Sequence, residues 1–240
     1  MIKTMDGEPH IYVDGAMELH GELYRPSVAP NDRAVLVVHE ADGIGGNVRR
    51  HCQRLAELGY IALAADMHGG GRVLEGDAMF EALHRFRADP DLLRARVNAG
   101  FQALLSLAGG DPSTCAAIGF CFSGFAALEL ARSGSPVAAV ASFHGLLTTA
   151  RPAGPGHVKA RVAVFTGARD PLVPSDHITA FQQEMGAAAA DWQLTTYGNA
   201  LHSFTNQDVD ALGDPRMGYD ATAHNLSWLA LLGFLESSQR

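Results

Sequence analysis

Residues 115–131 read CAAIGFCFSGFAALELA, and this stretch decides the fold. Cys115 to Gly119 form a short apolar run typical of a buried strand, and Phe122 to Arg132 favour a helix. The hexapeptide GFCFSG joins the two. A strand that turns abruptly into a helix needs small residues at the turn, and it lifts the side chain at the apex, here Cys121, above the edge of the sheet. The stretch predicts a nucleophile elbow.

Two residues of the hexapeptide carry a nucleophilic atom, Cys121 and Ser123. A frame centred on Ser123 would need glycine at positions 121 and 125, where the sequence has Cys and Phe. A frame centred on Cys121 has Gly119 two residues before it and a small residue two after it, followed by Gly124. The apex also opens a helix, whose partial positive charge favours a thiolate. We therefore assign Cys121 as the nucleophile; the alternative is an inert buried thiol, the common state of a free cysteine.

Outside the elbow, short apolar runs alternate with helical segments from Arg33 onward, the βαβ pattern of a mostly parallel sheet with helices on both faces. Asn47 is a candidate N-cap of the first helix. Before this series, two segments flank Asp14-Gly15, a favoured hairpin dipeptide, and predict an antiparallel pair at one edge, residues 11–13 and 17–24. We expect a single α/β domain over residues 1–240. The other predicted strands are residues 34–39, 61–65, 115–119, 137–143, 161–166 and 192–197, and the predicted helices are residues 47–58, 91–107, 122–132, 176–185 and 221–235.

The loops after two later strands carry the partners that a nucleophile needs. The strand at 161–166 runs into GARDP, which places Asp170 on the following loop, and the strand at 192–197 is followed by GNALHSF, which places His202 on the next one. Nucleophile, acid and histidine in this chain order, each after a strand, are the arrangement of a hydrolytic triad on such a sheet. Taken singly, Asp170 is also a common turn or cap residue, and a loop histidine is commonly solvated.

Composition and charge restrict the classes of partner. The formal net charge of −8 argues against nucleic acid and anionic membranes, which are bound through clustered Lys and Arg. Residues 1–22 mix acidic residues among apolar ones, so we expect no signal peptide, no membrane span and a cytoplasmic location. The three cysteines, Cys52, Cys115 and Cys121, show no paired spacing, which predicts reduced thiols, with Cys52 and Cys115 structural.

Four motifs together make the sequence resemble the dienelactone hydrolase family over nearly its whole length. They are HEADG at 39–43, GFCFSG at 119–124, GARD at 167–170 and LHSF at 201–204. The resemblance implies an α/β-hydrolase fold in which Cys121, Asp170 and His202 form a catalytic triad. It also implies that Glu40 is a fourth functional residue, which exchanges contacts with the thiol and helps to convert it to a thiolate.

In such a fold the loop that contains Glu40 adjoins the nucleophile, so the backbone N–H groups of Ala41 and Phe122 are the expected oxyanion hole. The motif HGGG at 68–71 matches lipase oxyanion loops, but it lies one βα unit too late in the chain. We interpret it as a flexible loop beside the pocket. Residues 67–90 exceed an ordinary loop and are expected to form a lid or a pocket wall.

The residues expected to bind the substrate depart from the family pattern. Family members that hydrolyse dienelactone hold its carboxylate with two arginines, one of them four residues beyond the catalytic histidine, where this sequence has Asn206. Arg72, Arg85 or Arg87 could serve as the other arginine, and we take Arg85 as the candidate. His144, at the end of a predicted strand, is expected to face the pocket. These differences leave hydrolysis intact and put specificity for dienelactone in question.

The sequence thus predicts a cysteine-dependent hydrolase of a small ester or lactone that works through an acyl-thioester and needs no metal or organic cofactor. His39, Glu40 and Asp42 are close in sequence but lack the H-E-x-x-H spacing of a zinc site. One alternative is a non-catalytic binding protein of the same fold, which would hold a small molecule without turnover. Another is a redox-responsive thiol protein, for which no resolving cysteine is evident. We expect a monomer or a small homo-oligomer.

Overall fold

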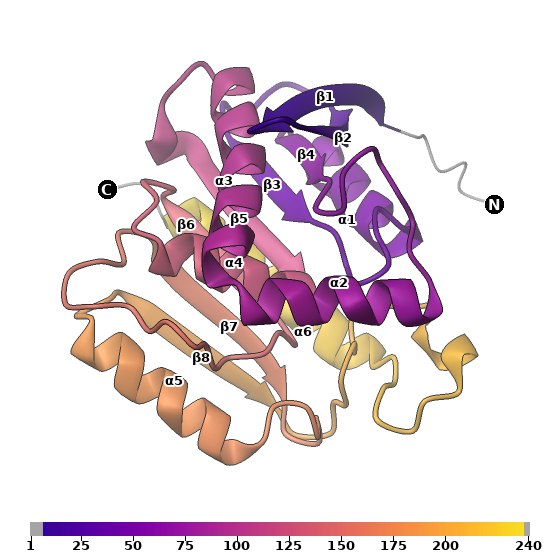
Figure 1. The fold of residues 1–240 in the computed structure, drawn as a ribbon, viewed down its shortest axis with the longest axis vertical. Coiled ribbons are helices and arrows are strands. Elements are labelled where there is room, and N and C mark those ends of the chain that lie inside the picture. Colours follow the sequence, from indigo (N-terminus) through magenta and orange to yellow (C-terminus); the bar gives the residue numbers. More distant parts are fainter. Residues whose placement is uncertain (1–6, 238–240) are drawn as a thin grey trace.

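The computed structural model describes residues 7–237 and arranges them as an eight-stranded sheet with helices on both faces (Figure 1). The strand order is β1-β2-β4-β3-β5-β6-β7-β8, and neighbouring strands from β4 to β8 are parallel. The antiparallel pair β1 and β2 lies at one edge and β8 at the other, which confirms the predicted α/β-hydrolase fold. The strands are β1 Glu8–Asp14, β2 Met17–Tyr24, β3 Ala34–Val38, β4 Ile61–Ala65, β5 Cys115–Phe120, β6 Ala139–Phe143, β7 Arg161–Gly167 and β8 Trp192–Tyr197. The helices are α1 Gly46–Glu57, α2 Gly76–Ala88, α3 Pro90–Leu107, α4 Phe122–Arg132, α5 Ser175–Ala187 and α6 Ala221–Ser237.

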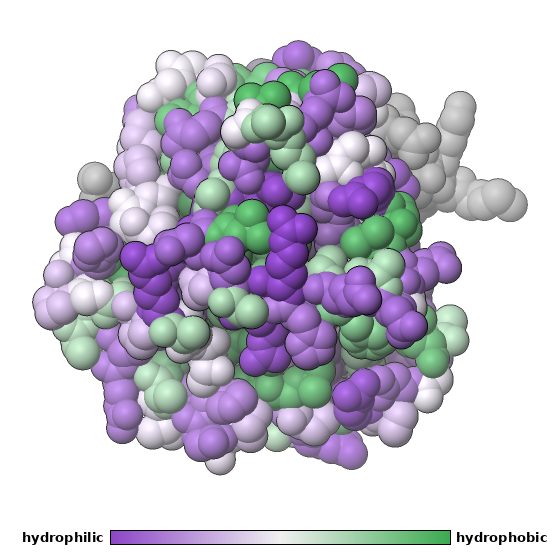
Figure 2. Space-filling model, in the orientation of Figure 1, coloured by the Kyte–Doolittle hydropathy of each residue, from purple (hydrophilic) through white to green (hydrophobic). Residues whose placement is uncertain are grey.

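Both ends of the predicted domain and the start of the predicted N-terminal segment, residues 1–6 and 238–240, lie outside the described residues. Among residues 7–237, no helix is both long enough and apolar enough to cross a bilayer. On the face shown in Figure 2, hydrophobic residues form small patches separated by hydrophilic ones. The large apolar clusters consist of buried residues.

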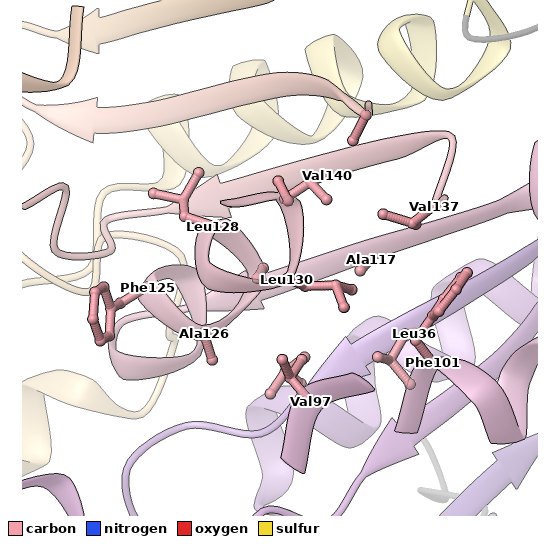
Figure 3. Packing of buried hydrophobic residues seen from close by; sticks show 14 of the residues in the cluster. Leu36, Val97, Phe101, Ala117, Phe125, Ala126, Leu128, Leu130, Val137 and Val140 are labelled. Atoms are coloured by element: carbon pink, nitrogen blue, oxygen red, sulfur yellow. The ribbon is translucent and has the colours of Figure 1, made fainter. Parts of the chain in front are cut away.

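The central strands are apolar on both sides because helices cover both faces of the sheet. Along β3, Val37 belongs to the core beneath α1 and α6, whereas its neighbour Leu36 belongs to the core beneath α3 and α4. Figure 3 shows Val97 and Phe101 of α3 beside Leu36. Burial of each such side chain stabilises the fold by about 1.5–3 kcal/mol. The result is a rigid sheet whose strand ends hold the functional loops in place.

The connections change direction between β3 and β5. The chain passes from β3 through α1 to β4 on one side, and from β5 through α4 to β6 on the other. The carboxyl ends of strands at such a switch point are where open α/β sheets bind ligands. The register places the loops after β3 and β5 at the same height above the sheet. Val38 pairs with Gly119, so Glu40 and Cys121 each lie two residues beyond this pair.

Apart from shifts of one to three residues at the ends of several elements, two helices differ from the prediction. Residues 67–90 contain the helix α2, which has only Phe86 buried and no side-chain cap, so the pattern of apolar residues does not reveal it as a core helix. Helix α1 has Gly45 at its cap position, so the prediction that Asn47 caps it is wrong; Asn47 lies within the first turn and is buried. Strands β4 and β8 and helix α4 match their predicted ranges residue for residue.

Candidate active site

The turn between β5 and α4 holds Cys121 in a backbone conformation that side chains rarely adopt. Cys121 has φ 56° and ψ −122° and directly precedes α4. The neighbouring glycines make room for this turn. A Cβ atom at Gly119 would lie 2.0 Å from the carbonyl oxygen of Ser123, and one at Gly124 would lie 2.9 Å from Cα of Gly145. The strained turn therefore dictates the small residues of the hexapeptide.

Ser123 is used inside the elbow. Its Oγ accepts a hydrogen bond from the N–H of Phe120 at 2.7 Å and donates one to the Phe120 carbonyl at 2.8 Å, and the residue is fully buried. The hydroxyl thus closes the turn from within. Cys121 is the residue of the hexapeptide with a nucleophilic side chain that reaches the pocket.

The structure brings Cys121, His202 and Asp170 into one hydrogen-bonded line. His202 Nε2 lies 3.0 Å from Cys121 Sγ, and His202 Nδ1 lies 2.8 Å from Asp170 Oδ2. Asp170 follows β7 and His202 follows β8. Because these strands are parallel, both residues lie at the carboxyl ends of the strands, as Cys121 does after β5. The N–H of Leu172 donates to Asp170 Oδ1 at 2.8 Å and so orients the carboxylate.

The surroundings of His202 favour its charged form. The residue is 1% exposed, and this burial alone would lower its pKa. The negative charge of Cys121 and the hydrogen bond to Asp170 act in the opposite direction and raise the pKa of His202 to about 10. His202 thus holds a proton between the sulfur of Cys121 and the carboxylate of Asp170.

The two backbone amides expected to form an oxyanion hole lie just beyond the ends of two neighbouring strands, β3 and β5, at equivalent distances along the chain. Ala41 lies three residues beyond Val38, and Phe122 lies three residues beyond its partner Gly119. Phe122 is the first residue of α4, so its N–H has no acceptor within the helix. The N–H of Ala41 donates to no other residue among 7–237. Both amides are available to a ligand.

Glu40 lies beside this line of residues and makes a hydrogen bond away from the thiol. Asn206 Nδ2 donates to Glu40 Oε2 at 3.3 Å. Asn206, which stands where the family pattern has an arginine, therefore contacts Glu40. Burial and then the charge of Asp42 raise the pKa of Glu40 to about 7, although the neighbouring His202 acts in the opposite direction. Glu40 therefore titrates near neutral pH.

Two residues expected to contact the substrate lie elsewhere. His144 is fully buried behind the elbow, where its Nδ1 accepts the N–H of Cys121 at 3.0 Å and its Nε2 donates to Thr205 Oγ1 at 2.8 Å. It therefore fixes the backbone of the nucleophile instead of facing the pocket. Arg85 is exposed on α2 and does not line the pocket, whereas Arg87, also an exposed residue of this helix, does.

A small pocket with a mainly apolar lining lies in front of Cys121 and has a volume of about 210 Å³. Residues 67–90 do form a pocket wall, and they do so through α2, which lies across the start of α4 in Figure 1. The α2 residues that face the pocket have the spacing i, i+3, i+4, i+7 of one helical face, but His84 and Arg87 are polar, so no apolar periodicity marks this face in the sequence. The lining residues are Phe80, Leu83, His84, Arg87, Cys121, Phe122, Leu146, Leu172 and His202.

The glycine-rich segment HGGG is fixed by hydrogen bonds, so the expectation of a flexible loop is wrong. The carboxylate of Asp66 accepts the N–H groups of His68, Gly69 and Gly71. The ring of His68 in turn lies 2.9 Å from the carbonyl oxygen of Ala41. The segment therefore supports the loop that follows β3.

The other two cysteines are fully buried, Cys52 at 0% and Cys115 at 1% exposure, as their structural assignment requires. Within the described chain, residues 7–237, no group of three or more His, Cys, Asp or Glu side chains is arranged to hold a metal ion.

Comparisons with known proteins identify the family and the fold. The model of the dienelactone hydrolase family matches residues 19–238. The crystal structure of a dienelactone hydrolase-like promiscuous phosphotriesterase from metagenomic libraries is 36% identical, with a TM-score of 0.88 over 96% of this chain and 97% of that one. A Yersinia pestis protein named "putative carboxymethylenebutenolidase" is 28% identical over 214 residues, 82% of this chain and 75% of its own length. The dienelactone hydrolase of Anabaena variabilis, at 22% identity, has the same fold, with a TM-score of 0.62 over 87% of this chain and 93% of that one.

Proposed function

Because this chain belongs to the dienelactone hydrolase family, and is thereby an ester or lactone hydrolase, we propose that it cleaves a small ester or lactone by attack of Cys121 on the carbonyl carbon. The observation that carries the proposal is the line from Asp170 Oδ2 through His202 to Cys121 Sγ, with contacts of 2.8 and 3.0 Å. A nucleophile, a base within hydrogen-bond reach and a group that orients the base are the parts that covalent catalysis needs.

In the first half of the reaction, the Cys121 thiolate attacks the carbonyl carbon, and the carbonyl oxygen becomes an oxyanion. The N–H groups of Ala41 and Phe122 stabilise it, by about 3 kcal/mol per donor in comparable sites. As the tetrahedral intermediate collapses, the C–O bond to the alcohol breaks and His202 Nε2 gives its proton to the departing oxygen. The product of this half is an acyl-thioester and a neutral His202.

In the second half, neutral His202 takes a proton from water, and the resulting hydroxide attacks the thioester carbonyl. The C–S bond breaks, the carboxylic acid leaves, and Cys121 returns as a thiolate beside protonated His202. Asp170 keeps the imidazole in one orientation throughout. The cycle consumes the ester and one water molecule, and Cys121 and His202 return to their initial states.

Glu40 belongs to the same proposal as the residue that assists thiolate formation. Its pKa of about 7 lets it hold or release a proton at neutral pH, as a group that accepts a proton from a thiol must. In the present arrangement it is hydrogen-bonded to Asn206, so an exchange of contacts toward Cys121 would accompany substrate binding.

The pocket suggests a small, mostly apolar substrate. Its volume of about 210 Å³ accommodates a compact ester or lactone, and Leu83, Leu146 and Leu172 supply an apolar lining. His84 and Arg87 are its polar elements on α2. Arg87 therefore replaces Arg85 as the candidate contact for an anionic group of the substrate.

The test is hydrolysis of p-nitrophenyl acetate by the wild type, Cys121→Ala and the matched control Cys52→Ala. We expect Cys121→Ala to lose at least about a thousandfold in kcat, because the nucleophile is gone. Cys52→Ala should retain activity, since Cys52 lies in the core away from the pocket. Mass spectrometry of the quenched wild type should detect one acetyl group on the peptide that contains Cys121.

Full activity in Cys121→Ala would overturn the assignment of the nucleophile. A wild type that binds small esters without releasing nitrophenolate would favour the non-catalytic binding protein.

A further inference from the structure

The peptide group that links Glu40 to Ala41 carries two functional atoms, the Glu40 carbonyl oxygen and the Ala41 N–H. These atoms belong to one rigid plane and point in opposite directions. The orientation of the carbonyl therefore sets the direction of the N–H. The ring of His39 contacts this carbonyl, with its Nδ1 2.5 Å from the Glu40 oxygen.

The backbone of Met67 fixes which nitrogen of His39 carries the proton. The Met67 N–H donates to His39 Nε2 at 2.9 Å, so Nε2 is an acceptor and Nδ1 of the neutral ring is the donor. His39 is fully buried, and burial together with the charge of His68 lowers its pKa to about 4. The ring thus stays neutral, and its Nδ1–H stays directed at the Glu40 oxygen.

A second histidine holds the next carbonyl along the chain. The Nε2 of His68 lies 2.9 Å from the Ala41 oxygen, and its ring centroid lies 4.5 Å from that of His39. Asp66 holds the backbone of this second histidine, since its Oδ1 accepts the His68 N–H at 2.8 Å. Two consecutive carbonyls are thereby tied to the loop that follows β4, one on each side of the Ala41 N–H.

We propose that His39 and His68 are positioning residues that clamp the Glu40–Ala41 turn and aim the Ala41 N–H at the developing oxyanion. The inference rests on the proposed function, because it assigns the Ala41 amide to the oxyanion hole. It also gives the HGGG segment a role, since its first residue, His68, orients the donor without supplying it.

Two physical effects follow from the clamp. A donor at the Glu40 oxygen polarises the peptide, which strengthens the Ala41 N–H as a donor because linked hydrogen bonds reinforce one another. The clamp also prevents rotation of the peptide plane, so the N–H needs no reorganisation when charge develops on the substrate, and such preorganisation is the main source of oxyanion stabilisation. Both effects act on the transition state and should appear in kcat before KM.

A matched pair of variants separates the two hydrogen bonds of His39. In His39→Asn, the side-chain amide nitrogen occupies the place of Nδ1 and keeps the donor to the Glu40 oxygen. In His39→Gln, the amide reaches the place of Nε2 and keeps the acceptor for the Met67 N–H but loses the donor. We expect His39→Gln to lower the rate of Cys121 acetylation by p-nitrophenyl acetate about tenfold or more, and His39→Asn to retain most of it.

Alkylation of Cys121 by iodoacetamide is the reference reaction, because displacement of iodide forms no oxyanion. We expect this rate to be the same in the wild type and both variants. A His39→Gln variant that is acetylated as fast as the wild type would overturn the proposal. So would equal losses in the Asn and Gln variants, or a parallel loss of alkylation, which would place the effect on the thiol or on the fold.

A second pair of variants, at His68, tests the clamp if a His39 variant does not fold. His68→Gln retains a donor for the Ala41 oxygen, and His68→Met fills similar space without one. We expect acetylation to fall in the Met variant and to persist in the Gln variant, while equal rates in the two would contradict the clamp. A wild type that is alkylated but never acetylated would instead overturn the proposed function itself.

Discussion

The chain contains two pairs of cysteine and histidine whose surroundings have opposite effects. Cys121 and His202 face each other at the carboxyl ends of β5 and β8, whereas Cys52 and His51 are neighbours on α1 inside the core. Burial, the charge of Cys121 and the contact with Asp170 together leave His202 with a pKa of about 10. Burial lowers the pKa of His51 far below 6.5 and raises that of Cys52 well above 9.0.

His51 and His202 are similarly buried, so the difference between these two histidines comes from their partners. His202 has a hydrogen-bond partner on each ring nitrogen, and both partners carry negative charge when ionised. Neither nitrogen of His51 has a hydrogen-bond partner among residues 7–237, and its surroundings include His224 and the positive charge of Arg54. A buried imidazole is thus stabilised in its charged form by a neighbouring carboxylate and destabilised in that form by neighbouring positive charge.

The largest expected effect comes from removing that carboxylate. Asp170→Asn should lower kcat by about a thousandfold, since the imidazole loses the charge and the acceptor that orient it. The matched control is Asp176→Asn, at an exposed position on α5, which should hydrolyse p-nitrophenyl acetate like the wild type. Comparable activity in Asp170→Asn would show that the line of contacts at His202 is not catalytic.

The same variant has a pH signature. His202 has a higher pKa in the fold, about 10, than the ordinary 6.5. Its proton therefore stabilises the fold fully below pH 6.5, and the contribution is lost as pH rises toward 10. In Asp170→Asn the pKa of His202 should fall, so thermal unfolding curves should show a smaller loss of stability between pH 7 and about 10 than in the wild type.

A smaller effect is expected in thiol labelling, which compares the cysteines directly. In the native protein, iodoacetamide should modify Cys121 alone, because Cys52 and Cys115 are shielded from solvent. In denaturant all three cysteines of the sequence should react. Peptide mapping gives the sites, and Cys121→Ala should show no label in the native state. Labelling of Cys52 at a rate comparable to that of Cys121 would remove the contrast between the two pairs.

The smallest effect concerns acid stability at His224, whose ring centroid lies 5.7 Å from that of His51. Burial, followed by the charges of Arg54 and Arg50, lowers the pKa of His224 to about 4. Its neutral form thus stabilises the fold fully above pH 6.5, and this contribution is lost as pH falls toward 4. His224→Gln keeps an acceptor for Arg54 but does not titrate.

We expect the stability of His224→Gln to decline less steeply than that of the wild type between pH 6.5 and 4, as measured by urea unfolding. His157→Gln, at an exposed position, is the control and should follow the wild type. Identical slopes for all three proteins would show that His224 does not contribute to acid sensitivity.

Much of this architecture could be predicted from the sequence because the determining signals are local. The buried strands are continuous apolar runs, and the elbow needs small residues within a few positions of Cys121, so both are visible in a single stretch. Asp170 and His202 could be placed because each follows a strand, and parallel strands deliver their ends to one edge. The structure brings these two residues to Cys121.

What the sequence did not reveal depends on contacts between distant segments. Helix α2 has one buried side chain, so its sequence shows no apolar stripe that would distinguish it from a loop. His144 follows a buried strand as a pocket residue would, but its left-handed backbone, φ 42°, takes the ring behind the elbow. The hydrogen bond from the Met67 N–H to His39 likewise exists only once β3 and β4 are adjacent.

Helix α2 lines the pocket but contributes little to the core, so the residues that shape the pocket are separate from those proposed to carry out the reaction. The helix supplies Phe80, Leu83, His84 and Arg87 to the pocket, while Phe86 is its buried residue. None of the proposed catalytic residues lies on it. Substitutions at the four pocket-facing positions thus alter the shape and charge of the pocket at little cost to the core. A new specificity can be selected on this helix while the reaction centre stays constant, which makes α2 the natural segment for a mutant library.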